Sequence, residues 1–297
     1  MLRPYRQRLE LALDVTISIV NWNTQEELRD CLASVFAQDN SIISEVIVVD
    51  NGSTDGSAEM IRTEFADRVI LIANSDNRGF GAAHNEAIKQ SAGRYIFLMN
   101  PDSQVVSKDA LKRMVEYMDA NEDIGILGPR ILNPDSTLQF SARRFPPMFA
   151  GVFRHTFLGK LFPRNRFVRG YLMSDESHDR IMDVDWVSGC AMLARRETLD
   201  EIGLFDERFF MYCEDVDLCK RAHQSDWRVV YYPEVEVSHR IGAASDKNPI
   251  AMIKQHHRSY LLYFLKHEAR GPKALLIPLL LIALWLRTRA RVRQVKM

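Results

Sequence analysis

The sequence predicts an α/β protein with a mostly parallel central sheet flanked by helices, and two observations support this fold class. Between residues 15 and about 132, short apolar runs typical of strands alternate with amphipathic stretches of helical length. Strands joined by such stretches favour parallel pairing through right-handed crossovers. The run 46–49 is also apolar at every position, which is typical of a parallel strand covered on both faces.

Composition and charge limit the possible functions. The 297 residues are 46% hydrophobic and 26% charged, values typical of a folded globular protein. The formal net charge is zero, so nothing global indicates a nucleic-acid partner, and we expect none. The cysteines lack the spacing of a metal site, and we predict reduced thiols near the core, in a cytosolic compartment. Residues 1–6 are basic, but no long apolar run follows them, so we expect no secretory signal.

The first half of the chain predicts a regular succession of elements. In the first helix Thr24 is the expected N-cap, and Leu28 and Leu32 share one apolar face. Ligands of parallel sheets bind at the carboxyl ends of the strands, where Asn21, Asp50 and Asp102 fall. The predicted strands span 15–20, 46–49, 69–72, 95–99 and 124–127, and the predicted helices span 25–37, 57–65, 80–90 and 108–118.

The second half is less regular. Residues 133–179, rich in proline and arginine, predict a long irregular loop with at most short helices, and such loops are often functional lids. Beyond it the patterns predict strands at 181–186, 189–194 and 228–232 and helices at 197–202 and 214–224. We expect acceptor specificity to reside in the loop.

The C-terminal residues form a third region. An amphipathic helix is predicted at 250–267, followed by the uncharged run 274–286 and an arginine-rich tail. This run is shorter than the about 20 residues that a bilayer span needs. Trp285 at its basic border suits a membrane surface, which predicts a peripheral protein on the inner, cytoplasmic face of the cell membrane. The alternative is a helix packed on the core or on another subunit.

Several motifs in this order resemble the family 2 glycosyltransferases of the GT-A fold, in particular the rhamnosyltransferase-like branch. The resemblance covers residues 14–245. It rests on the segments 18–23, 48–56, 77–81, 100–102, 186–189, 209–212 and 214–217 and on His239. The resemblance implies a GT-A domain at 14–245, with a nucleotide-sugar half at 14–132 and an acceptor half at 133–245. It leaves an N-terminal extension at 1–13 and a membrane-associating helical segment at 246–297.

The resemblance implies that Asn21, Asp50, Asn77, Gly79 and Asp102 bind the nucleotide. A strand-end carboxylate such as Asp50 can accept the imide N–H of uracil or thymine, although it could instead only cap the next helix. Residues 79–84 superficially suggest a dinucleotide-binding oxidoreductase. They lack the third glycine and do not open the first strand–turn–helix unit, which argues against that class.

The segment 100–102 stands where the family usually has Asp-x-Asp. Asp102 matches the metal-binding acid, and the resemblance adds His239 as a further ligand of Mg²⁺ or Mn²⁺. Asn100 departs from the pattern because a neutral amide replaces a carboxylate. A plain turn at 100–102 and a structural role for His239 remain as alternatives.

The acidic pair at 214–215 resembles the pair that the family places near the acceptor. An inverting transfer needs a base, for which we predict Asp215, supported by Glu214. The alternative is a pair of acids that merely favour a helix N-terminus. Trp186 and Gly189 are predicted to wall the acceptor pocket, although a core tryptophan would show the same pattern.

Together these features predict an inverting glycosyltransferase of cell-surface polysaccharide synthesis. The branch implies rhamnose from dTDP-rhamnose as donor and a glycan, on its own or linked to a polyprenyl lipid, as acceptor. One alternative is a UDP-sugar-dependent enzyme of the same family. The other is a non-catalytic nucleotide- or glycan-binding protein of the same fold, which Asn100 would permit.

Overall fold

A computed structural model describes residues 13–39, 41–42, 44–147, 166–243 and 245–296. The predicted N-terminal extension, apart from Leu13, and residues 148–165 of the predicted loop lie outside the described residues.

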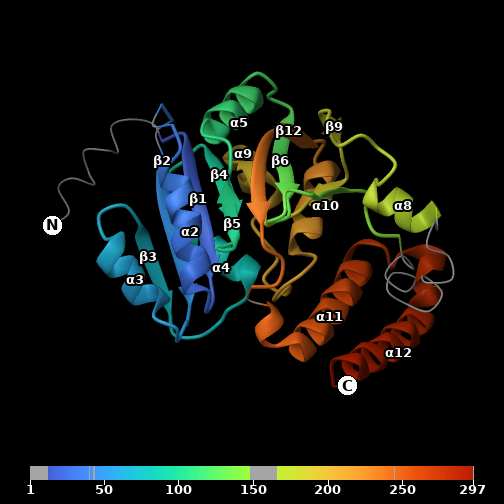
Figure 1. The fold of residues 1–297 in the computed structure, drawn as a ribbon. Coiled ribbons are helices and arrows are strands. Elements are labelled where there is room, and N and C mark those ends of the chain that lie inside the picture. The colour runs from blue at the N-terminus through green and yellow to red at the C-terminus, as the bar shows by residue number, and fades with distance from the viewer. Residues whose placement is uncertain (1–12, 40, 43, 148–165, 244, 297) are drawn as a thin grey trace.

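One mixed sheet runs through both predicted halves of the chain (Figure 1). Its main path has the order β3-β2-β1-β4-β11-β6-β12-β5, with β7 beside β6 and β9 beside β12, while β8 and β10 form a separate pair. The strands are β1 (Val15–Asn21), β2 (Ser44–Asn51), β3 (Ile70–Asn74), β4 (Tyr95–Met99), β5 (Ser103–Val105), β6 (Ile124–Leu132), β7 (Leu138–Gln139), β8 (Ala142–Arg143), β9 (Met182–Asp183), β10 (Trp186–Val187), β11 (Ala191–Arg195) and β12 (Arg228–His239).

Helices cover both faces of this sheet. Alternation along β1 directs Val15, Ile17 and Ile19 into a core shared with α2 and α5, while Ser18 faces α4 and contacts His84 at 2.8 Å. The helices are α2 (Gln25–Phe36), α3 (Ser57–Glu64), α4 (Phe80–Gln90), α5 (Ala110–Asp119), α8 (Arg166–Leu172), α9 (Arg196–Ile202), α10 (Glu214–Gln224), α11 (Pro249–His267) and α12 (Ile277–Lys296), with short 3₁₀ turns η1 (Ser245–Lys247) and η2 (Gly271–Leu276).

The predicted α/β class and the elements of the first half are confirmed, with boundary shifts of one to a few residues. Thr24 does stand at the start of α2, but it is not a side-chain cap, because its hydroxyl donates to Asn21 Oδ1 at 2.7 Å. That bond orients the side-chain amide of Asn21 at the end of β1, and the first N–H groups of α2 are left to other partners.

The strands predicted for the second half of the chain differ more from the observed ones. The strand predicted at 181–186 is two short strands, β9 and β10, which pair with different partners, β12 and β8. The strand predicted at 228–232 extends to His239, with a register irregularity between Tyr232 and Glu236 that lets it continue past Pro233. β11 pairs antiparallel with both β4 and β6, so the sheet is only partly parallel. Pairing partners come from distant segments, which local periodicity does not report.

The C-terminal region forms two packed helices, α11 and α12, which lie side by side on the far side of the molecule from β3 (Figure 1). The apolar run and the arginine-rich tail, treated separately in the sequence, are largely one helix, α12. Leu280 and Leu284 are buried in the core cluster of α10 and α11. The described residues contain no helix that is long and apolar enough to cross a bilayer.

Candidate active site

Two of the predicted nucleotide residues meet at the carboxyl ends of β1 and β2. Asn21 and Asp50 are register partners, and Asn21 Nδ2 donates to Asp50 Oδ1 at 2.7 Å. The other oxygen of Asp50 accepts from the backbone N–H of Ser53 at 3.0 Å. Asp50 does not cap α3, because that helix begins after Gly56. Each carboxylate oxygen keeps a lone pair, so a nucleobase N–H could still be accepted.

Asn77 and Gly79 form the turn that leads into α4. Asn77 Oδ1 accepts from the N–H of Gly79 at 2.9 Å, and the Gly79 carbonyl accepts from Asn51 Nδ2 at 3.2 Å. Gly79 has a φ of +91°, and a Cβ there would lie 2.4 Å from the carbonyl oxygen of Phe210. The next residue, Phe80, donates its N–H to that oxygen at 2.8 Å. Gly79 therefore allows α4 to dock against the segment that precedes α10.

Asp102 and His239 come together although 137 positions separate them in the sequence. His239 Nε2 lies 3.3 Å from Asp102 Oδ1 and 3.2 Å from Asn100 Nδ2. On the other side of the ring, Nδ1 lies 2.8 Å from Gln139 Oε1. Burial alone would lower the pKa of His239, but Cys190 and the Asp102 carboxylate raise it to about 10.

This pair can serve a divalent cation only together with other ligands. Asp102 Oδ1 is buried without a hydrogen-bond partner among the described residues, which leaves an oxygen donor available beside an imidazole. No group of three or more His, Cys, Asp or Glu side chains gathers as a metal cage in the described part of the chain. The residues therefore fit a Mg²⁺ or Mn²⁺ ion held first by the Asp102 carboxylate, with further ligands from a donor diphosphate and water. His239 could join them only by losing the proton that its raised pKa favours.

The acidic pair occupies the first turn of α10. Tyr212 and Cys213, with φ of 69° and 67°, bend the chain sharply just before the helix begins at Glu214. Asp215 accepts from the N–H of Gly189 at 3.0 Å and from that of Val216 at 2.8 Å. Such strain is found at functional sites, where the surroundings hold it in place.

Burial sets the protonation of both acids. It raises the pKa of Asp215, although the two N–H donors and the charge of Arg143 act in the opposite direction. Burial and the neighbouring charge of Asp215 raise the pKa of Glu214 well above its usual value. Glu214 Oε2 is buried without a hydrogen-bond partner among the described residues. Burial therefore increases the proton affinity of both acids, and the neighbouring charge of Asp215 increases that of Glu214 further.

A single backbone segment connects the two acidic centres. The N–H of Gly189 holds Asp215, and the carbonyl of Cys190 accepts from the N–H of Asn100 and from the hydroxyl of Ser103, both at 3.0 Å. A Cβ on Gly189 would lie 3.3 Å from Asp215 Cβ. Gly189 thus lies against the predicted base and leaves little room for a side chain of its own.

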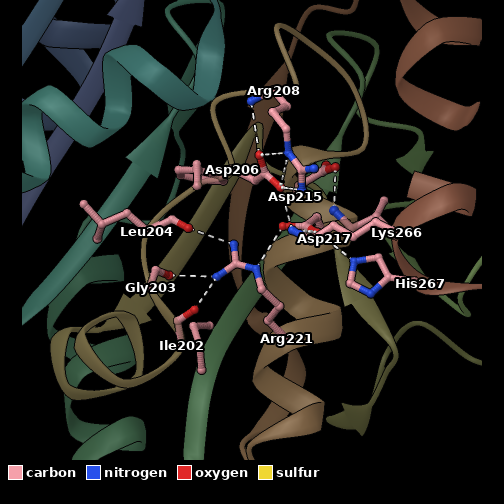
Figure 2. A network of polar contacts seen from close by, with 12 residues as sticks. Ile202, Gly203, Leu204, Asp206, Arg208, Asp215, Asp217, Arg221, Lys266 and His267 are labelled. Atoms are coloured by element: carbon pink, nitrogen blue, oxygen red, sulfur yellow. Dashed lines mark hydrogen bonds and ion pairs between the residues drawn. The ribbon is translucent and has the colours of Figure 1, made fainter. Parts of the chain in front are cut away.

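Behind the acidic pair, Asp217 joins α10 to α11 (Figure 2). It is fully buried, and it accepts from Lys266 at 2.6 Å, from His267 at 2.7 Å and from Arg221 at 2.9 Å. Burial raises its pKa, but the hydrogen bond from His267 and the charges of Arg221 and Lys266 together lower it below the usual value. Arg221 also donates to the carbonyl oxygens of Ile202, Gly203 and Leu204. The network fixes the helix that carries Asp215.

Trp186 lies in the interior. It is 5% exposed, and its indole N–H donates to the carbonyl of Arg144 at 2.9 Å. The guanidinium of Arg143 lies 5.0 Å from the centre of its ring. Trp186 therefore matches the core alternative of the sequence pattern more closely than an open pocket wall.

Sequence reasoning assigned no role to Arg143, Gln139 or Asp217. The first two lie in the irregular segment 133–179, where no periodicity indicates which side chains face inward. Asp217 belongs to the motif 214–217. The signal that could have distinguished it is its position between the apolar residues Val216 and Leu218 on a helix.

Comparison with known proteins identifies the family and the fold. Residues 16–202 match the model of glycosyl transferase family 2. The chain is 32% identical, over 256 residues, to the N-acetylglucosaminyl-diphospho-decaprenol L-rhamnosyltransferase of Mycobacterium tuberculosis, a match that covers 82% of this chain and 81% of the relative.

Two solved glycosyltransferases share the fold. The mannosyltransferase PcManGT of Pyrobaculum calidifontis, in complex with GDP-Man and Mn²⁺, superposes with a TM-score of 0.59 at 19% identity, covering 98% of this chain and 79% of that one. GalNAc-T7 with UDP, GalNAc and Mn²⁺ gives 0.59 at 15% identity, covering 84% and 48%. At these identities the likeness concerns the fold alone, and it confirms the expected GT-A fold.

Proposed function

The chain belongs to glycosyl transferase family 2, and from this premise we propose that it is an inverting rhamnosyltransferase. The donor is dTDP-rhamnose, and the acceptor is a glycan carried on a polyprenyl diphosphate, used in cell-surface polysaccharide synthesis. The likeness over most of its length to an enzyme whose name gives both rhamnose and a diphospho-decaprenol acceptor supports this choice. A UDP-sugar donor is the alternative that the binding experiment below tests.

One observation carries the mechanism. Gly189 N–H positions the Asp215 carboxylate, and the adjacent Cys190 carbonyl binds the segment that holds Asp102. A donor whose diphosphate lies at Asp102 and an acceptor hydroxyl at Asp215 would thus be positioned by two consecutive residues. Reacting groups held in this way lose little entropy on reaching the transition state.

Asp215 removes the proton of the acceptor hydroxyl as its oxygen attacks the anomeric carbon from the face opposite the leaving group. The bond from that carbon to the donor diphosphate breaks, the nucleoside diphosphate leaves, and the configuration inverts. Asp102 and His239 would hold a divalent cation, which, when bound, neutralises charge on the leaving diphosphate. Asn21 and Asp50 orient the nucleobase, and Asn77 and Gly79 shape the turn beside it.

The proposed location is the cytoplasmic surface of the membrane, contacted through α12. Leu279, Ile282 and Leu286, one side of this helix, are 57%, 57% and 55% exposed, next to the exposed Trp285 under Arg289. Replacing all three by glutamine should abolish sedimentation with anionic vesicles at low salt. Val106→Gln, at a residue 52% exposed elsewhere, is the control and should sediment like the wild type. Equal sedimentation of both variants would refute the assignment.

The decisive experiment is donor binding by calorimetry with dTDP-rhamnose, UDP-sugars and NAD(H), each with and without Mg²⁺ or Mn²⁺. We expect metal-dependent binding of dTDP-rhamnose and transfer to N-acetylglucosaminyl polyprenyl diphosphate with inversion. If only a UDP-sugar binds, the assignment of dTDP-rhamnose as donor is wrong and the UDP-sugar is the donor. Binding without metal dependence would remove the metal role of Asp102 and His239, and binding without turnover would favour the non-catalytic alternative that Asn100 permits.

A further inference from the structure

We propose that Arg143 forms a subsite for the diphosphate of the acceptor, beside the base Asp215. The inference rests on the proposed function, because it assumes an acceptor whose attacked sugar is attached to a diphosphate. It adds a ligand-binding residue, with a stated ligand chemistry, in the irregular segment of the chain.

The position of Arg143 is fixed by three neighbours. It ends β8, where it is the register partner of Trp186 on β10. Its guanidinium carbon lies 5.0 Å from the centre of the Trp186 ring and 5.9 Å from that of Tyr171, and its Nε donates to the carbonyl of Phe140 at 2.9 Å. The side chain thus lies against two aromatic rings, an arrangement that favours a guanidinium.

The guanidinium of Arg143 is not in direct contact with a carboxylate of the described residues. Among the described residues it makes no ion pair, whereas the neighbouring Arg144 lies 3.2 Å from Asp185 and Arg130 lies 2.7 Å from Asp179. Arg143 is also partly buried, so water screens its charge incompletely. A positioned cation that contacts no carboxylate is ready to receive an anion.

The anion would bind close to the base. The charge of Arg143 is near enough to Asp215 to oppose the rise in the pKa of that acid. Ser188, which follows β10, donates its N–H to the carbonyl of Ser141, and Arg143 Nε donates to the carbonyl of Phe140. The Arg143 side chain is therefore turned back along β8 toward the residues that lie opposite Ser188, the neighbour of Gly189. In the proposed acceptor only one sugar ring separates the attacking hydroxyl from the first phosphate, which matches this arrangement.

The chemistry of the side chain suits a phosphate. Its Nε is engaged by Phe140, which leaves the N–H groups of both terminal nitrogens for oxygen acceptors. Guanidinium groups bind phosphate oxygens through paired, charge-assisted hydrogen bonds. A neutral sugar would not require a cation at this point, and the Asp215 carboxylate would repel a phosphate that had none beside it.

The segment that follows Arg143 leads toward the helices proposed to face the membrane. Phe145 lies under Lys220 of α10, and the carbonyl of Pro147 accepts from the hydroxyl of Tyr260 on α11 at 2.9 Å. α11 in turn packs against α12. The acceptor sugar, its diphosphate and its lipid would therefore meet Asp215, Arg143 and the α11–α12 pair in that order.

The test compares Arg143→Gln with Arg144→Gln, a matched loss of the adjacent, ion-paired arginine. Each variant is given N-acetylglucosaminyl farnesyl diphosphate and an uncharged farnesyl glycoside of the same sugar. We expect Arg143→Gln to raise the KM for the diphosphate acceptor about 10- to 100-fold. The KM for the neutral acceptor and for the donor should change less than about twofold, and Arg144→Gln should resemble the wild type.

An equal rise for both acceptors would overturn the inference in favour of a structural role, and a rise in donor KM would assign Arg143 to the donor diphosphate. An unchanged KM would also refute it. Calorimetric binding of the farnesyl diphosphate compound, without donor, gives the same comparison independently of turnover. If the wild type binds it and Arg143→Gln does not, the subsite stands even where the proposed donor fails.

Discussion

The two sides of α10 treat the same residue type in opposite ways. On the side of Gly189, Asp215 is buried and accepts from backbone N–H groups, and its pKa is raised. On the side of α11, Asp217 is buried against Lys266, His267 and Arg221, and its pKa is lowered. Two positions along one helix therefore separate a carboxylate suited to accept a proton from one that is held ionised.

The difference shows how burial and nearby cations together set the pKa of a carboxylate. Burial opposes charge at both positions, so the outcome depends on whether cations compensate for it. The paired acid anchors the helix, and the unpaired acid gains the proton affinity that a general base requires. The four experiments below test this comparison, from the largest expected effect to the smallest.

The largest effect is expected on turnover, for Asp215→Asn. The amide preserves the shape but cannot accept the proton, so kcat should fall about 10²- to 10⁴-fold. Donor affinity and melting temperature should stay close to those of the wild type. Steady-state kinetics with calorimetry measure both. Glu214→Gln is the control, because it keeps the Asp215 carboxylate in place, and its loss of kcat should be far smaller. Unchanged turnover in Asp215→Asn would remove this residue from the mechanism.

On the other side of α10, the expected loss is in stability. Asp217→Asn removes the buried carboxylate shared by Lys266, His267 and Arg221, although Lys266 keeps Asp206 at 2.7 Å. We expect the free energy of unfolding to fall by about 3–5 kcal/mol. Urea denaturation measures it. Asp175→Asn breaks the exposed pair with Arg169, at 2.6 Å, and should cost only about 0–1 kcal/mol. Similar losses in the two variants would mean that the Asp217 network contributes little to the anchoring of α10.

The pH dependence of stability should differ in sign between the two sides. The folded pKa of Asp217 lies below the unfolded value of about 3.9, so its contribution is present above that value and is lost as pH falls toward the folded pKa. The folded pKa of Glu214 is raised, so its contribution is present at low pH and is lost as pH rises above about 4.3. Denaturation curves from pH 3 to 8 for wild type, Asp217→Asn and Glu214→Gln measure both slopes. Parallel curves would contradict the comparison.

A small displacement of the base should have a smaller effect. In Gly189→Ala the new Cβ would lie 3.3 Å from Asp215 Cβ and 3.5 Å from a ring carbon of Phe80, so the neighbours must shift by a few tenths of an ångström. We expect kcat to fall about tenfold with little change in donor affinity. Gly170→Ala, where a Cβ meets nothing within 4 Å, is the control. Equal activity of the two variants would show that Gly189 tolerates a side chain.

Much of the fold followed from the sequence. Apolar runs and helical periodicity predicted the elements from β1 to α5, except the short strand β5, with small boundary shifts, because each predicted element is encoded by its own residues. The antiparallel insertion of β11 between β4 and β6, and the separation of β9 from β10, were not predictable in this way. They depend on hydrogen bonds between segments far apart in the chain, which leave no local period.

The features of the candidate site also separate into those encoded locally and those set by contacts between distant segments. The sequence by itself determined the family motifs and put Asn21, Asp50, Asp102 and the acid pair 214–215 at the ends of elements, since such positions can be read locally. Only the tertiary structure decided that His239 reaches Asp102 and that Gly189 holds Asp215. It also decided that Lys266, 49 positions away, neutralises Asp217, and that the guanidinium of Arg143 contacts no carboxylate of the described residues. Charge and proton affinity depend on the neighbours that folding supplies, and a linear sequence does not state those neighbours.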